Sequence, residues 1–153
     1  MNRLTQQEAN MLIEMLKRTV EQRKLDFPKE KGRVEFEVVG DKQDEKFVVN
    51  ISRKGINAQG ATYMGRVKRS GEILMRLDVN PSGKHRNPDG EIITGTHLHV
   101  YTEEHGLTMA MPFDVEKNDL FELCFLFFTR FNIVEPPAFN HYQQSLSDIG
   151  EVV

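Results

Sequence analysis

The sequence of 153 residues contains a single cysteine, Cys124, and so lacks the pair that an internal disulfide needs. This absence excludes a disulfide-stapled secreted fold and favours a reducing compartment. The N-terminal segment has no uninterrupted apolar region of the kind found in signal peptides. The most apolar run, residues 120–128, is interrupted by Glu122 and is far shorter than the roughly 20 residues that cross a bilayer. We therefore expect a cytoplasmic protein with no membrane partner.

Charge is nearly balanced overall, with 23 acidic and 20 basic residues, but it is unevenly distributed along the chain. Between residues 53 and 86, eight basic residues stand against two acidic ones, a local balance of +6. A basic middle segment in an acidic protein can attract RNA or another phosphate-bearing ligand. A strand-rich segment with lysine and arginine on its solvated face has the same composition, so both interpretations stay open.

Two segments have helical spacing. In residues 5–24, Thr5 followed by Glu8 is the signature of a capping box at a helix N-terminus. The apolar residues behind this signature recur every three or four positions, which predicts one buried stripe. The stripe comprises Met11, Leu12, Met15, Leu16 and Val20. Residues 118–131 are apolar nearly all round, with Asn118 in the cap position, which predicts a central, buried C-terminal helix.

Over residues 33–113, apolar and polar residues alternate in six segments, which indicates six strands joined as hairpins. Residues 80–95 carry Asn, Pro and Gly turn signals and are predicted to form a long loop. Residues 138–153 have few apolar positions and are predicted to be a loosely held tail. The predicted fold is one α+β domain over residues 1–153: a curved antiparallel sheet of about six strands, with an N-terminal helix and a buried C-terminal helix.

Polar and titratable residues gather on one face of the predicted sheet, because side chains alternate along each strand. One strand contributes Arg76 and Asp78, followed by Asn80. A later strand contributes His97, His99 and Tyr101. The loop between these strands adds Lys84, His85, Arg86 and Asn87. If the two strands pair, all of these groups meet at one site.

The leading interpretation of this site is cleavage of RNA without a metal, as in a toxin-type endoribonuclease. His97 and His99 would exchange protons with the substrate, because histidine titrates near neutral pH. Arg76 would stabilise the charge on phosphorus, and Asp78 would orient one imidazole. The catalytic set is His97, His99, Arg76, His85 and Tyr101, and the binding set is Asp78, Asn80, Lys84, Arg86, Asn87 and Arg66. This chemistry requires no cofactor and no metal.

Other functions fit the same residues. One alternative is a non-catalytic factor of a phage or mobile element that binds nucleic acid or a host protein partner. A second is metal binding, because His97-x-His99-x3-Glu103 resembles the first histidine motif of the cupins and suits Zn, Fe, Ni or Mn. The second cupin motif has no counterpart, since residues 116–131 have a helical pattern. A third interpretation involves no chemistry, only a sheet face that carries satisfied polar side chains.

Three motifs carry a family resemblance: "RLDVN", "HRNPDG" and "THLHVY". With their surroundings, over residues 53–137, they resemble an uncharacterised domain family of bacteria and their phages with the pattern Arg-x-Asp-x-Asn, His-x-Asn-Pro-Asp-Gly and Thr-His-x-His-x-Tyr. The matching positions are Arg76, Asp78, Asn80, His85, Asn87, Pro88, Asp89, Gly90, Thr96, His97, His99 and Tyr101. The resemblance implies no established activity. Small proteins of mobile elements are often toxins or defence factors, which is an association and not a mechanism.

Overall fold

The computed structural model describes residues 3–54, 60–113 and 119–140. Within these ranges the helices are α1 (Gln6–Glu14) and α2 (Leu120–Arg130). The strands are β1 (Lys17–Thr19), β2 (Lys31–Gly40), β3 (Lys46–Lys54), β4 (Ala61–Val67), β5 (Ile73–Val79), β6 (Lys84–Arg86), β7 (Ile92–Thr94), β8 (His97–Val100), β9 (Ala110–Pro112) and β10 (Ile133–Glu135). The α+β class, with a helix near each end of the described chain, is as predicted.

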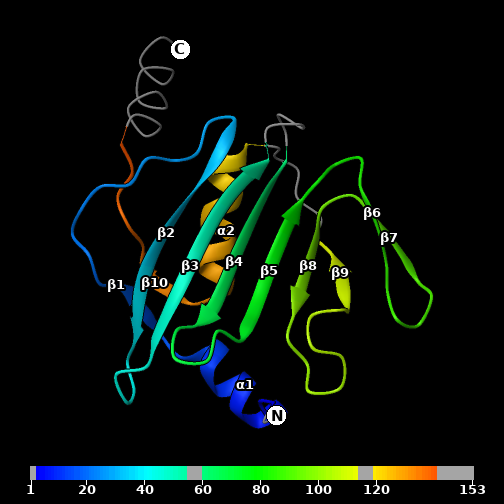
Figure 1. The fold of residues 1–153 in the computed structure, drawn as a ribbon, viewed down its shortest axis with the longest axis horizontal. Coiled ribbons are helices and arrows are strands. Elements are labelled where there is room, and N and C mark those ends of the chain that lie inside the picture. The colour runs from blue at the N-terminus through cyan, green and yellow to red at the C-terminus, as the bar shows by residue number, and fades with distance from the viewer. Residues whose placement is uncertain (1–2, 55–59, 114–118, 141–153) are drawn as a thin grey trace.

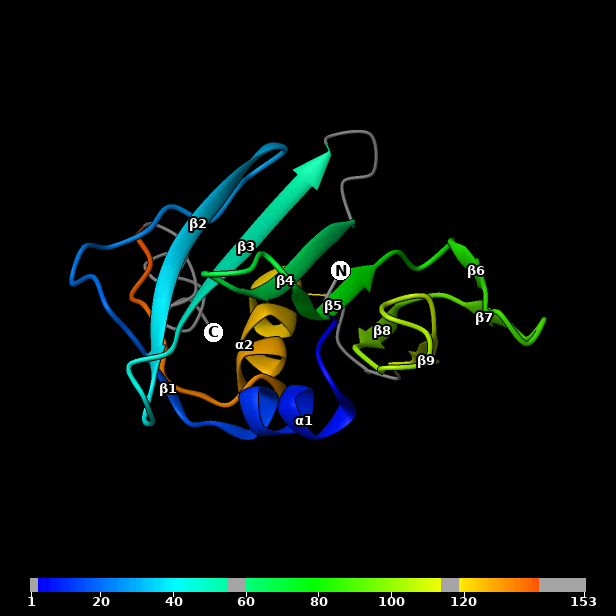
Figure 2. The same ribbon diagram turned by 60° about the horizontal axis from the view of Figure 1, so that its bottom comes forward.

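Eight of the described strands form one sheet in the order β10-β1-β2-β3-β4-β5-β8-β9, and β6 pairs with β7 in a separate hairpin (Figure 1). Within the sheet, β1 and β10 run parallel and the other neighbouring strands are antiparallel. Both helices lie against the same face of the sheet (Figure 2). We call the opposite face the outer face. Neither helix of the described chain combines the length and apolar character that a bilayer span requires.

The core lies between the sheet and α2, and phenylalanine supplies much of it. The ring centroid of Phe128 on α2 lies 5.7 Å from that of Phe36 on β2, and Phe131 lies 5.8 Å from Phe47 on β3. Both pairs are edge to face, a geometry that adds about 0.5–1.5 kcal/mol to the burial of the rings. The prediction of a buried C-terminal helix is therefore confirmed.

The start of α2 differs slightly from the predicted range 118–131. Asp119 is the N-cap, and its carboxylate accepts the backbone N–H of Phe121 at 2.9 Å. Asn118, the predicted cap, lies outside the described residues. Because a cap satisfies a backbone donor that the first helical turn leaves unpaired, Asp119 fixes where α2 begins.

The N-terminal helix is shorter than the predicted range 5–24. Its capping box is confirmed: the Thr5 hydroxyl accepts the Glu8 N–H, and the Glu8 carboxylate accepts the Thr5 N–H. The helix nevertheless ends at Glu14, because the chain then extends and pairs β1 with both β2 and β10. Backbone pairing with distant strands therefore overrides the helical spacing of the sequence.

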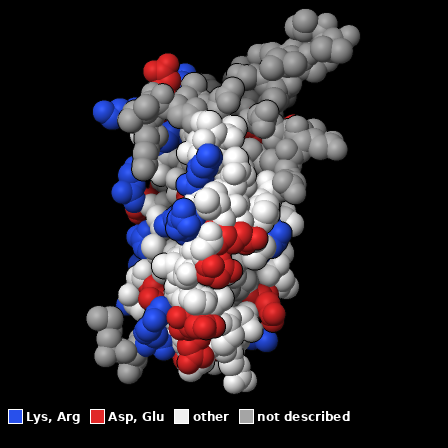
Figure 3. All heavy atoms as spheres, turned by 90° about the vertical axis from the view of Figure 1, so that its right-hand side faces the viewer, with Lys and Arg blue, Asp and Glu red and all other residues white. Residues whose placement is uncertain are grey.

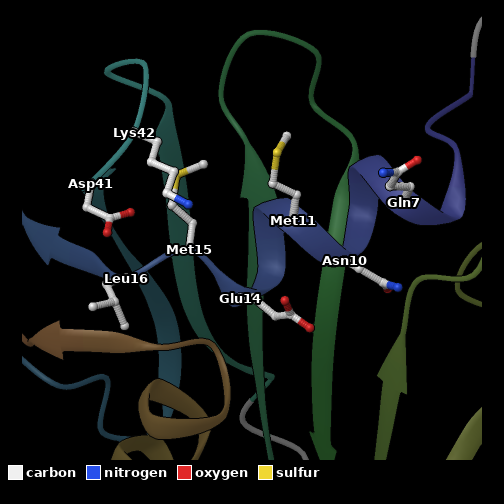
Figure 4. A pocket seen from close by; sticks show the side chains of 8 residues that line it. All are labelled: Gln7, Asn10, Met11, Glu14, Met15, Leu16, Asp41 and Lys42. Carbon is white, nitrogen blue, oxygen red and sulfur yellow. The ribbon is translucent and has the colours of Figure 1, made fainter.

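This early end corrects the predicted apolar stripe. Leu12 and Met15 are buried as expected, but Leu16 and Val20 are 50% and 42% exposed because they lie beyond the helix. Met11 is also exposed, on the solvent side of α1. Met11 and Leu16 border a shallow groove whose other lining side chains are mostly polar (Figure 4).

The described sheet has more strands than the predicted six, which correspond to β2, β3, β4, β5, β8 and β9. Strands β1 and β10 extend one edge and make the sheet mixed, whereas a purely antiparallel sheet was predicted. The predicted loop 80–95 contains the β6–β7 hairpin. Each of these additional strands has three residues, too few for an alternating pattern to be recognised.

The predicted tail, residues 138–153, is wrong for its first three residues. Phe139 is 2% exposed, and its ring centroid lies 5.3 Å from that of Phe121 on α2. The backbone beside it pairs with Leu25, whose N–H donates to the Ala138 carbonyl at 2.9 Å. One large aromatic residue thus packs this segment onto the core. Residues 141–153 lie outside the described residues.

A bulge in β5 sets the direction of the side chains at the site. Gly65 of β4 pairs with Met75, and the next residue of β4 pairs with Ile73, which leaves Leu74 without a partner. Leu74 is fully buried, whereas Ile73 lies on the outer face. Beyond the bulge, regular alternation buries Met75 and Leu77 and directs the residues between them outward.

Gly65 is expected to tolerate no side chain. A Cβ at Gly65 would lie 2.5 Å from a ring carbon of Phe131, whose ring is fully buried, so that a side chain here displaces packed core atoms. Gly65→Ala is therefore expected to lower the free energy of unfolding by about 1–3 kcal/mol through overpacking. Urea unfolding measures this effect. In a Phe131→Leu background the same substitution should be milder, and an equal loss in both backgrounds would contradict the explanation.

Candidate functional site

The pairing of β5 with β8 brings four polar side chains together on the outer face. Arg76 lies opposite His99, and Asp78 lies opposite His97. Residues directly opposite each other in an antiparallel pair direct their side chains to the same face. The prediction that these four residues share one face of the sheet is therefore confirmed.

The Asp78 carboxylate is the centre of this group. Its Oδ2 atom lies 3.3 Å from Nε2 of His97 and 3.3 Å from Nε2 of His99. The Arg76 Nε donates to Oδ1 at 3.1 Å, and an Nη of the same guanidinium lies 3.2 Å from Nε2 of His99. Arg76 thus holds the carboxylate between the two imidazoles.

His85 joins the group from the β6–β7 hairpin. Its ring stacks on that of His97 with 5.4 Å between centroids and meets the ring of His99 edge to face at 4.8 Å. One ring nitrogen of each of these histidines lies within 4.8 Å of the others. We call His85, His97, His99 and Asp78 the histidine cluster.

The hairpin that carries His85 is fastened to β9 by a buried amide. Asn87 is 2% exposed; its Nδ2 donates to the Ala110 carbonyl at 2.9 Å, and its Oδ1 accepts the Ala110 N–H at 2.8 Å. Asn87 was predicted to bind a ligand, but both sides of its amide are occupied by backbone. Its observed contacts position the hairpin, and with it His85.

Each imidazole of the cluster is oriented by a backbone carbonyl. Nδ1 of His97 lies 2.8 Å from the Gly95 oxygen, and Nδ1 of His99 lies 2.6 Å from the Leu107 oxygen. Nε2 of His85 lies 2.8 Å from the Thr108 oxygen. A carbonyl oxygen only accepts, so each of these nitrogens carries the proton. In a neutral ring, the second nitrogen then holds a lone pair; in a protonated ring of His97 or His99, the second nitrogen instead donates a hydrogen bond to Asp78.

The electrostatics of the cluster depend on Asp78. Burial alone would raise the pKa of this carboxyl, but hydrogen bonds from His97 and His99 and the charge of Arg76 hold the pKa well below its usual range. The hydrogen bond to Asp78 in turn raises the pKa of His97, against the lowering effect of burial. The carboxylate is therefore charged at neutral pH, and His97 holds its proton more tightly than a free imidazole does.

A groove of about 710 Å³ opens on the outer face beside the cluster. Its lining includes Ser52, Thr62, Arg76, Asp78, Lys84 and His85, with His97 at the same end. His97 is 6% exposed and reaches the groove, whereas His99 is 1% exposed and is not among the lining residues. A ligand in this groove would contact one side of the cluster, with His99 beneath it.

Two residues expected near the histidines are placed elsewhere. Strand β8 ends at Val100, and Tyr101 turns into the core, where its hydroxyl donates to the Leu4 carbonyl at 2.8 Å. Glu103, the carboxylate of the cupin-like motif, accepts the backbone N–H of Gln6 at 2.9 Å near the start of α1. The alternation that grouped them with the histidines stops where the strand stops.

Of the remaining predicted residues, two line the groove, two lie outside its lining, and none belongs to the cluster. Asn80 and Lys84 line the groove. Arg86 is exposed on β6, and Arg66 donates to the Asn50 side chain farther along the outer face. His85 was expected at this site because the predicted loop between the two strands carries it, and the structure places its ring against His97 and His99. What the sequence did not reveal is the hairpin that carries His85 and the buried Asn87 amide that fastens it to β9.

Comparison of the chain with known proteins identifies the family to which it belongs. No curated protein and no solved structure matches the chain. The sequence model of a family of unknown function matches residues 4–133, which include the cluster, both described helices and the first residue of β10. The match begins well before residue 53, where the resemblance expected from the motifs begins, and so takes in the N-terminal helix as well. The chain therefore belongs to a family of unknown function (DUF6978).

Proposed function

We propose that this protein binds one divalent first-row transition-metal ion, such as Zn²⁺, through the histidine cluster and uses it as a Lewis acid at the groove. The observation that carries the proposal is the convergence of three imidazoles from β6 and β8, whose ring nitrogens lie within 4.8 Å of one another beside a carboxylate. Imidazole and carboxylate are the ligands that such ions take in catalytic sites.

The surroundings of the cluster support this proposal. Histidines that bind metals usually donate their other ring N–H to a carbonyl or carboxylate, which fixes the tautomer. The carbonyls of Gly95, Leu107 and Thr108 occupy that position for the three imidazoles. Ligands about 2.1 Å from a tetrahedral zinc ion lie about 3.4 Å apart. The ring nitrogens would therefore move about an ångström closer together around a cation. A shift of the β6–β7 hairpin that carries His85 would allow this.

Metal-independent cleavage of RNA has less support. Two imidazoles that exchange protons with one substrate must both reach it, but His99 is 1% exposed and does not line the groove. The ligand set of the metal alternative also changes. His85 and Asp78, and not Glu103, accompany the two paired histidines. A bound metal ion supplies a water molecule whose pKa is lowered to about 7, which suits hydrolysis. Hydrolysis is therefore the reaction class that we propose.

Calorimetric titration of the chelator-treated protein with Zn²⁺ tests the site. We expect one equivalent to bind, and we expect His85→Ala, His97→Ala and His99→Ala each to weaken binding at least about 100-fold, because each removes one ligand. His105→Ala is the matched control, since His105 lies in the turn after β8 and outside the cluster. It should bind Zn²⁺ as the unaltered protein does.

Asp78→Asn gives a second variant that keeps the shape of the side chain. It should fold, as judged by circular dichroism, and should still bind Zn²⁺ at least about tenfold more weakly, because a charged ligand is lost. Absorption of the Co²⁺-loaded protein in the visible range reports the ligand set directly. A full equivalent of Zn²⁺ that binds equally to all cluster variants would overturn the proposal, as would no binding at all.

A further inference from the structure

The groove beside the cluster carries more positive than negative charge. Among the described residues that line it, Asp78 is the only carboxylate, whereas Arg76 and Lys84 are both cationic. Asp78 is already paired with Arg76 and is itself a member of the cluster. Lys84 is exposed and forms no ion pair with any residue in the described ranges. A divalent cation at the cluster would add further positive charge at the same end of the groove.

The charge distribution of the surface agrees with this. Seen from the side of the β6–β7 hairpin, Lys and Arg lie along the left-hand edge, which belongs to the outer face, while Asp and Glu gather lower down (Figure 3). Basic side chains at this edge attract an approaching anion.

The rest of the groove has the lining of a small-molecule site. Met64, Ile73 and Val79 give it apolar walls, and the hydroxyls of Ser52 and Thr62 can bond to oxygen atoms. Its volume of about 710 Å³ lies within the range of about 300–1,000 Å³ typical of ligand pockets. A ligand that fits must therefore combine one strongly anionic group with a body of moderate size.

Resting on the metal site proposed above, we infer that the groove binds a phosphate ester of about nucleotide size, with a phosphoryl oxygen at the metal end and the Lys84 ammonium as its second cationic contact. A phosphoryl group carries up to two negative charges on three oxygens, so it can contact a metal ion and an ammonium at once. The ester's organic body then lies against the apolar walls.

Equilibrium binding of adenosine 5′-monophosphate and of inorganic phosphate to the Zn²⁺-loaded protein tests this inference. Both are expected to bind, whereas adenosine and acetate at equal concentration should bind at least about tenfold more weakly, because neither offers a doubly charged group. Chelation of the metal should weaken binding of the nucleotide at least about tenfold. A preference for acetate over phosphate would overturn the substrate class.

One lysine variant and one arginine variant, both on β6, test whether phosphate binding depends on the cation in the groove. Lys84→Gln removes the cation at the groove and should weaken phosphate binding about tenfold. Arg86→Gln removes the same charge two residues along the strand, outside the groove lining, and should change binding less than about twofold. Neither residue belongs to the cluster, so both variants should keep one equivalent of Zn²⁺.

The outcomes separate this inference from the proposed function. Zn²⁺ bound by the cluster without any binding of phosphate or nucleotide would overturn the inference and leave the metal site intact. Phosphate binding that does not respond to Zn²⁺ or to Lys84→Gln would also overturn it. Failure of Zn²⁺ to bind at all would overturn both proposals.

Discussion

Replacement of Lys17 with methionine is expected to lower the free energy of unfolding by about 3–5 kcal/mol. The Lys17 side chain is 1% exposed, and its Nζ donates to the carbonyls of Ile13 at 2.9 Å, Met15 at 2.9 Å and Phe131 at 2.8 Å. Each carbonyl left unpaired in the interior costs about 1–3 kcal/mol. Methionine has similar length but no donor, so the variant isolates the loss of these bonds.

The position of Lys17 explains why this one residue matters. Ile13 and Met15 are at the end of α1, and Phe131 is the C-cap of α2, so the Lys17 amino group donates to carbonyls at the negative ends of both helix dipoles. Its Nζ also lies 4.1 Å from the ring centroid of Phe131 and 4.8 Å from that of Phe47. These contacts of the Lys17 amino group connect β1 to both helix ends.

The lowered pKa of Lys17 is expected to make the free energy of unfolding depend on pH. Burial lowers the pKa of Lys17 to about 7, from an ordinary value of 10.5. Between these two values the unfolded chain binds more protons than the folded chain, so the contribution of Lys17 to stability rises with pH across that window. The stability difference between the unaltered protein and Lys17→Met should therefore be larger at pH 9 than at pH 7.

Urea unfolding followed by circular dichroism at both pH values measures these effects. Lys46→Met, at an exposed position on β3, should change the free energy of unfolding by less than about 0.5 kcal/mol. If Lys17→Met folds as stably as Lys46→Met, the buried Lys17 amino group does not stabilise the fold through these carbonyls. A difference that shrinks between pH 7 and pH 9 would contradict the lowered pKa.

Zn²⁺ at about a thousand times its dissociation constant is expected to raise the melting temperature by about 10 °C. Binding to the folded state alone at that concentration stabilises it by about 4 kcal/mol, and each kcal/mol corresponds to about 2–4 °C for a chain of this size. The proposed ligands come from β5, β6 and β8. The ion would therefore tie the β6–β7 hairpin to the sheet.

Calorimetry with Zn²⁺ and after addition of EDTA measures this stabilisation and its reversal. His105→Ala should show the same increase in melting temperature as the unaltered protein. His85→Ala should show little of it, because its hairpin would no longer be tied to the sheet by the ion. An equal increase in both variants would mean that Zn²⁺ acts elsewhere on the chain.

Local patterns in the sequence were enough to predict which cluster residues the paired strands contribute. Alternation alone places Arg76 and Asp78 on one face, and His97 and His99 on one face of another strand, because the side-chain period of a strand is fixed. To bring the two pairs of side chains together, the prediction had only to assume that these strands are neighbours in the sheet. The Thr5–Glu8 capping box could likewise be predicted from the sequence, because its two residues are only three positions apart.

The other features depend on contacts between distant residues. His85 reaches the cluster because Asn87 bonds to Ala110, 23 residues away. Lys17 leaves the helical pattern because its N–H donates to the Asn132 carbonyl at 2.8 Å in the turn before β10. No local pattern encodes such partners, and three-residue strands carry too little periodicity to compensate.

The two outermost strands of the described sheet, β9 and β10, have three residues each. An edge strand exposes unpaired backbone groups with which a strand of another chain can pair. Such pairing begins most readily at long, flat edges. Here each edge offers only a short row of these groups, and Pro112 at the end of β9 has no N–H to donate. The order of the strands therefore places the long central strands inside the sheet and leaves little template for fibrous self-assembly at either side.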